Sequence, residues 1–152
     1  MNRVEITLEG VEEPPWLERV TPFAEAALEK LEKRNWDLSL LFCGNGTIRS
    51  LNRQYRNLDE ATDVLSFPLG ESAGERFLPG DIAISLEALD ENARRFGVSP
   101  DEELRRLLIH GILHLGGMDH ASNDKEEPML VLQEELLEEL SAKIIITGKE
   151  NR

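Results

Sequence analysis

Cysteine is nearly absent from this sequence, and so are long apolar runs. Cys43 is the only cysteine among 152 residues, which excludes an intramolecular disulfide and leaves a cysteine-based zinc site without ligands. No stretch approaches the roughly 20 apolar residues that a membrane helix needs, and the opening Met-Asn-Arg-Val-Glu-Ile lacks the apolar run of a signal peptide. These absences predict a soluble, cytoplasmic protein with no membrane partner.

Basic residues are also scarce. The chain has 17 lysines and arginines against 30 acidic residues, which gives a net charge of -13. This balance argues against a general nucleic-acid binder, because phosphate binding depends on clustered lysine and arginine. Many of the acids fall in residues 126–139 or on the polar faces of expected helices, where a solvated surface is the simplest interpretation.

Four short segments have the composition of strands. Residues 3–8 alternate between apolar and polar side chains, which is the period of a half-buried strand. Further strands are expected at 38–42, at 64–68, where Pro68 should end the strand, and at 81–85. A loop or hairpin rich in glycine and glutamate separates the last two.

Helical patterns lie between and after these strands. Amphipathic spacing predicts helices over about 16–34 and from about residue 48 to Arg56. Two more helices are expected over 86–96, where Gly97 caps the end, and over 129–140. Ser99, Pro100 and Glu102 form a strong start signal for another helix. A short isoleucine segment at 144–146 and a charged tail follow. Of the α+β and α/β classes that this order allows, we expect one α+β domain over 1–152, with a small mixed sheet of about four strands packed with helices.

All three histidines fall within eleven residues, at His110, His114 and His120. Two histidines at i and i+4 on a helix project from one face, so both imidazoles can reach one ion. Gly116 and Gly117 then end the helix, and a glycine with positive φ lets the chain turn back toward the same point. The spacing therefore predicts a metal site with these three ligands.

Three imidazoles suit a borderline metal and leave one tetrahedral position open, as catalytic sites do. We expect one zinc ion per chain, although Ni²⁺ or another divalent metal fits the same donors. Such an ion lowers the pKa of bound water to about 7, which points to hydrolysis. Asp119 is a candidate fourth ligand or a partner that supports one of the histidines.

The spacing overlaps the metzincin protease pattern, His-Glu-x-x-His-x-x-Gly-x-x-His. Gly111 stands where those proteases have their general-base glutamate, and it has no side chain that could accept a proton. A conventional metzincin mechanism is therefore disfavoured. Metal-bound hydroxide must act alone, or a carboxylate from another part of the chain must assist it.

Three arginines would form one basic stripe if residues 49–56 are helical. Arg49, Arg53 and Arg56 are spaced at i, i+4 and i+7. Such a stripe could bind phosphates and stabilise the charge that builds on phosphorus during cleavage. The alternative is that these arginines pair with surface carboxylates, and the spacing alone favours that alternative.

Four sequence blocks resemble the YbeY family. They are Asn-Arg-Gln-Tyr-Arg at 52–56, Thr-Asp-Val-Leu-Ser-Phe-Pro at 62–68, Gly-Asp-Ile-Ala-Ile-Ser at 80–85, and His-Gly-x-Leu-His-Leu-x-Gly-x-Asp-His at 110–120. The resemblance implies a mixed sheet with helices, distantly like metalloproteases. It also implies a single-strand-specific endoribonuclease that acts in ribosomal RNA maturation, at the 3′ end of 16S RNA, and in ribosome quality control.

The resemblance also assigns residues and partners. It makes His110, His114 and His120 the metal ligands and Arg56 the catalytic or RNA-contacting arginine, and we take Arg56 and His114 as the candidate catalytic residues. Arg49 and Arg53 remain candidate RNA-binding residues. The partners would be single-stranded ribosomal RNA and a ribosomal subunit or ribosomal protein. Two other functions stay open from the residues: a zinc-stabilised ribosome-assembly factor without catalysis, and a metzincin-like peptidase.

Overall fold

The computed structural model of the chain describes residues 1–148, so the end of the expected charged tail, at 149–152, lies outside the described residues. Its strands are β1 (Arg3–Glu9), β2 (Trp36–Cys43), β3 (Val64–Ala73) and β4 (Arg76–Ser85). They form one four-stranded sheet in the order β1-β2-β4-β3. The pairs β1–β2 and β2–β4 are parallel, and β3–β4 is antiparallel, which confirms the expected mixed sheet and α+β class.

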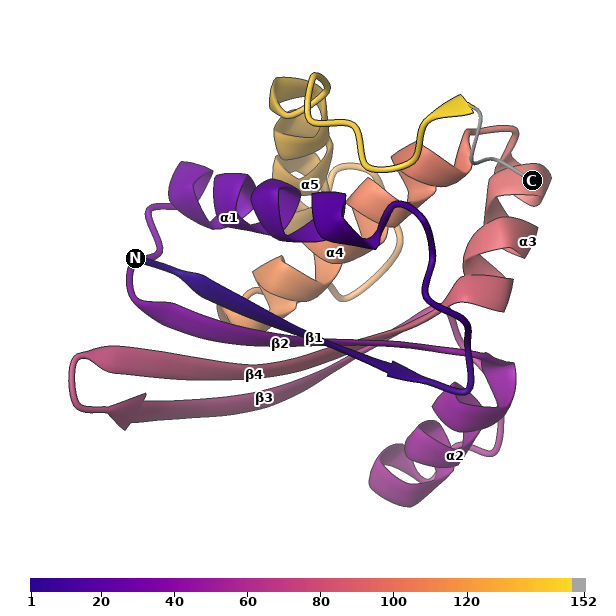
Figure 1. The fold of residues 1–152 in the computed structure, drawn as a ribbon, viewed down its shortest axis with the longest axis horizontal. Coiled ribbons are helices and arrows are strands. Elements are labelled where there is room, and N and C mark those ends of the chain that lie inside the picture. Colours follow the sequence, from indigo (N-terminus) through magenta and orange to yellow (C-terminus); the bar gives the residue numbers. More distant parts are fainter. Residues whose placement is uncertain (149–152) are drawn as a thin grey trace.

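Most of the helical mass covers one face of the sheet. The helices are α1 (Val20–Lys30), α2 (Asn45–Arg56), α3 (Leu86–Phe96), α4 (Pro100–Leu115) and α5 (Pro128–Glu139), with a single 3₁₀ turn at Leu17–Arg19. In Figure 1, α1, α4 and α5 lie above the sheet, whereas α2 lies below it at one end. No helix within residues 1–148 is long and apolar enough to span a membrane.

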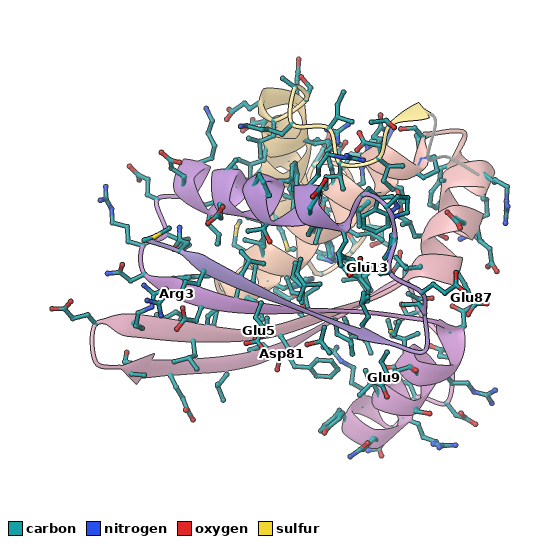
Figure 2. All side chains as sticks on the ribbon, viewed as in Figure 1. Arg3, Glu5, Glu9, Glu13, Asp81 and Glu87 are labelled. Atoms are coloured by element: carbon teal, nitrogen blue, oxygen red, sulfur yellow. The ribbon has the colours of Figure 1, made fainter. Side chains whose placement is uncertain are left out.

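The two faces of the sheet bury different amounts of apolar surface. The main core lies between the sheet and α1 and α4, and its fully buried members include Phe23, Phe42, Ile82 and Leu108. A smaller cluster lies between α2 and the opposite face of the sheet, and it contains Cys43, Ile48, Leu65 and Ala83. The rest of that second face is open, and Figure 2 shows Glu5, Glu9 and Asp81 on it.

Several predicted boundaries were wrong, including the start of β4, which lies at Arg76 and not at residue 81. The helix expected over 16–34 is a 3₁₀ turn followed by α1, which stops at Lys30 because Glu32 adopts a left-handed backbone conformation with φ of 57°. The strand expected to stop at Pro68 continues to Ala73 and forms a hairpin with β4. Proline is tolerated there because β3 is an edge strand, where an outward backbone N–H is not needed.

Gly80 lets the two hairpin strands approach closely opposite Pro68. Its φ is 133°, and a Cβ atom at this position would lie 2.1 Å from the carbonyl oxygen of Phe67. Only glycine fits this backbone. The hairpin register therefore shifts just beyond this point, between Pro68 and Glu71.

Candidate metal centre

Helix α4 presents the first two histidines. It begins as the sequence predicts: Pro100 is its first residue, and the Ser99 hydroxyl accepts a hydrogen bond from the Glu102 backbone N–H at 3.1 Å. His110 and His114 project from the same side of α4, and their Nε2 atoms are 3.1 Å apart. Two nitrogen ligands of a tetrahedral zinc ion, each at about 2.0–2.1 Å from it, are separated by about 3.3 Å.

A glycine turn carries the third histidine to the same point. Helix α4 ends at Leu115, and Gly117 adopts a φ of 96°. The turn is closed by a 3.0 Å hydrogen bond from the Met118 backbone N–H to the Leu113 carbonyl. As a result the His120 ring lies 5.3 Å from that of His110 and 5.4 Å from that of His114, centroid to centroid. One ligand nitrogen from each of the three residues lies within 4.8 Å of the other two.

Each histidine has its outer nitrogen, Nδ1, against an oxygen atom. The partners are Gln133 Oε1 at 2.6 Å for His110, the Met118 carbonyl at 3.1 Å for His114, and the Ser122 carbonyl at 2.8 Å for His120. Because these oxygens can only accept, each Nδ1 carries the proton. The Nε2 lone pairs are then free, and a shared cation bound between them would stabilise their close approach. This donor set fits a divalent metal ion.

Burial favours the neutral form of His110 and His114. Burial lowers the pKa of His110 below its ordinary value, although the hydrogen bond with Gln133 opposes this shift. Burial also lowers the pKa of His114, and the neighbouring His110 lowers it further. Neutral imidazole is the form that binds a metal, so the fold favours binding over protonation near neutral pH.

Asp119 supports the turn and lies outside the three-histidine group. Its Oδ1 accepts a hydrogen bond from the His120 backbone N–H at 2.8 Å and lies 3.9 Å from His114 Nδ1. Its side chain is 88% exposed. Of the two roles that the sequence left open, this geometry agrees with a supporting partner better than with a fourth ligand.

Arg56 faces the histidines across a cavity. It is the last residue of α2, which ends where Asn57 turns left-handed with a φ of 58°. Its Nη2 donates a 2.7 Å hydrogen bond to the Ser66 carbonyl on β3. Arg56, Ser66, His110 and His114 all line a cavity of about 450 Å³.

The other two arginines of the expected stripe do not join this cavity. Arg49 forms two hydrogen bonds with the Asp59 carboxylate, at 2.9 and 3.2 Å, and this pairing lowers the pKa of Asp59. Arg53 is exposed on the turn of α2 between Arg49 and Arg56. Of the three arginines, Arg56 alone is among the described residues that line the cavity. For Arg49 this contact agrees with the surface-pairing alternative.

Gly111 is fixed by close packing against the sheet. A Cβ atom at this position would lie 2.8 Å from Cδ1 and 2.9 Å from Cγ2 of Ile82 on β4. No glutamate side chain fits between α4 and β4 here. The general base of a metzincin protease is thus excluded at this position by packing as well as by sequence.

Residues that sequence reasoning missed lie around the histidines. Gln133 on α5 is buried and contacts His110, and the carbonyls of Met118, Ser122 and Ser66 contact His114, His120 and Arg56. Gln133 alone left a signal in the sequence. It is a polar residue in the apolar stripe of α5, four residues after Met129 and three before Leu136.

Known proteins resemble this chain over most of its length. Residues 5–141 match the family model described as Endoribonuclease YbeY. A protein of that name from Treponema denticola is 54% identical over 124 residues, covering 78% of this chain and 80% of the relative. Another from Treponema pallidum is 49% identical over 142 residues, covering 90% and 89%. The solution structure of TM1509 from Thermotoga maritima superposes with a TM-score of 0.65 at 33% identity, covering 94% of this chain and 91% of that one.

Proposed function

This chain belongs to the endoribonuclease YbeY family, and on that premise we propose that it is a metal-dependent endoribonuclease that cuts single-stranded RNA. The observation that carries the proposal is that Arg56, His110 and His114 line one cavity of about 450 Å³. A metal-binding donor set and a phosphate-binding cation thus face the same space. In metal-assisted phosphodiester hydrolysis the ion would supply the activated water, and the cation would stabilise the charge that builds on the phosphate.

We assign the metal site to zinc, held by His110, His114 and His120. Three neutral imidazoles are the donor set of open catalytic zinc sites, although Ni²⁺ or another divalent ion can use it. When bound, zinc acts as a Lewis acid and lowers the pKa of water to about 7. The protein's part is to favour the neutral form of His110 and His114 and to bring one ligand nitrogen of each of the three histidines together.

Arg56 is the proposed catalytic partner of the histidines. A guanidinium group presents five N–H donors, and the Ser66 carbonyl accepts from one nitrogen at 2.7 Å. The remaining N–H groups can bind a phosphate, whose negative charge grows during cleavage. Arg53, exposed on the same helix, would add a weaker RNA contact, whereas Arg49 is already paired with Asp59.

The proposed substrate is ribosomal RNA, including the 3′ end of 16S RNA, in maturation and quality control of cytoplasmic ribosomes. This assignment rests on the family resemblance. The net charge of -13 leaves few cations for a phosphate backbone. We therefore propose that a ribosomal subunit or a ribosomal protein presents the single strand to the cavity.

A peptidase is less well supported, since Gly111 packs against Ile82 where a protease has its glutamate. A non-catalytic assembly factor, in which the metal only joins α4 to its following turn, predicts a different set of properties. It would lose stability when metal is removed, still bind ribosomal subunits, and cut no RNA.

The proposal can be tested with untagged, purified protein. Metal content is measured by elemental analysis, and cleavage of a single-stranded RNA and of the same sequence in a duplex is measured before chelation, after it, and after zinc is restored. We expect one zinc per chain, with cleavage of the single strand alone that disappears and returns. Bound zinc without cleavage under any condition would favour the assembly factor, and metal-dependent cleavage of unfolded protein would favour the peptidase.

A further inference from the structure

One histidine of the metal centre depends on a side chain for its orientation. His114 and His120 have backbone carbonyls against their Nδ1 atoms, which no substitution removes directly. His110 instead has Gln133 Oε1, at 2.6 Å. Gln133 is only 7% exposed and comes from a different helix, α5. Gln133 lies outside the histidine motif, and its polar side chain in the apolar stripe of α5 is the signal that it leaves in the sequence.

We propose that Gln133 is a positioning residue that sets the tautomer of His110 for metal binding, and that Glu134 and Arg106 fix Gln133 in turn. The inference rests on the metal site of the proposed function. A neutral imidazole can carry its proton on either nitrogen, and only the tautomer with the proton on Nδ1 leaves Nε2 free for a metal. An acceptor held against Nδ1 selects that tautomer before the metal arrives.

The contacts around Gln133 determine which end of its amide faces His110. Gln133 Nε2 donates to Glu134 Oε2 at 3.1 Å. Arg106 donates to both oxygens of the same carboxylate, at 3.0 and 3.1 Å, and thereby lowers the pKa of Glu134. An ionised carboxylate can only accept, so the amide NH₂ of Gln133 must face Glu134 and its oxygen must face His110.

The network closes on the helix from which it started. Arg106 lies on α4 one turn before His110, and it also contacts Glu102 at 3.1 Å. The sequence of contacts therefore runs from α4 to α5 and back to α4. Because Arg106 can only donate and the Glu134 carboxylate can only accept, these two ends fix the orientation of the Gln133 amide between them and His110, and reversing one bond would leave a partner unsatisfied.

The test begins with metal-free, ¹⁵N-labelled protein at a pH where all three histidines are neutral. The imidazole ¹⁵N shifts report which nitrogen carries the proton. We expect Nδ1–H for His110 in the wild type and a shift toward Nε2–H in Gln133→Leu, with His114 and His120 unchanged. Zinc affinity, measured by competition with a chromophoric chelator, should fall by about 10–100-fold.

A double substitution separates positioning from structure. The double variant Gln133→Glu with Glu134→Gln exchanges the two side chains. The carboxylate at position 133 then accepts from His110, and the amide at position 134 links that carboxylate to Arg106. This variant should recover most of the lost affinity, and Glu135→Gln, on the next residue of α5, should match the wild type. Unfolding of each metal-free variant is measured in parallel.

Wild-type affinity and an unchanged His110 tautomer in Gln133→Leu would overturn this inference alone. So would a loss of affinity that the double substitution does not restore and that matches a loss of metal-free stability. A wild-type protein that binds no zinc would count against the metal site itself, and so against the proposed function.

Discussion

The two walls of the cavity differ in how firmly they hold their functional groups. On the histidine wall, formed by α4 and the turn that follows it, the Nδ1 atoms of His110 and His114 each have an oxygen partner, and α4 packs onto the main core. On the arginine wall, α2 packs on the smaller cluster, and Arg56 is exposed with a hydrogen bond to one carbonyl. The difference suggests a division of roles. Metal ligands must be preorganised, whereas a side chain that binds a large substrate benefits from freedom to adjust.

The largest effect should come from breaking the histidine wall. His114→Ala removes one of three ligands, and loss of a mere supporting partner already lowers metal affinity by about 10–100-fold. We expect a larger loss of zinc affinity and no measurable RNA cleavage. Elemental analysis and a cleavage assay would check both. If folded, zinc-free His114→Ala still cleaved RNA, the histidine wall would not be the part of the cavity on which the reaction depends most.

Breaking the arginine wall should affect the reaction and leave the metal in place. Arg56→Ala should keep wild-type zinc content while cleavage falls by about 10²–10³-fold, the usual cost of losing one group that stabilises transition-state charge. Single-turnover cleavage with saturating enzyme measures the chemical step. Arg53→Ala is the matched control on the same helix, and it should weaken RNA binding more than it slows cleavage.

The packing of the two walls can be compared with two glycine substitutions. Gly111→Ala forces a Cβ atom against Ile82 and should lower the free energy of unfolding by about 1–3 kcal/mol. Gly46→Ala, on α2, meets no atom within 4 Å and should raise it by about 0.5 kcal/mol. Urea denaturation measures both.

A double variant then locates the effect of Gly111→Ala. Adding Ile82→Val removes the Cδ1 atom that lies 2.8 Å from the new Cβ position. The combined loss of stability should be smaller than the sum of the two single losses. Additive losses would show that the contact with Cδ1 of Ile82 is not the source of the strain.

The smallest effect should come from the arginine that is already paired. Arg49→Ala breaks an exposed ion pair with Asp59, and such pairs contribute little. Cleavage and zinc content should both stay within about twofold of the wild type. A loss as large as that of Arg56→Ala would show that the basic stripe acts as one surface, which would remove the contrast within α2.

Local signals in the sequence predicted much of the fold. The Ser99 cap and the Gly97 stop are confirmed, since both depend on backbone groups within a few residues of each other. The α+β class and the mixed sheet are confirmed as well. One error arose where a distant contact overrides a local preference. Pro68 ends a strand in most settings, but an edge position in the sheet tolerates it.

The sequence by itself determined that three imidazoles can meet, because helical spacing and a glycine turn act within eleven residues. Only the tertiary structure decided what surrounds them. It brought Arg56 to the cavity and paired Arg49 with Asp59, although both arginines lie on one helix. It also set Gln133 against His110 across 23 residues of sequence. These contacts depend on how α2, α4 and α5 pack against the sheet, and periodicity within a segment carries no information about the partner it will meet.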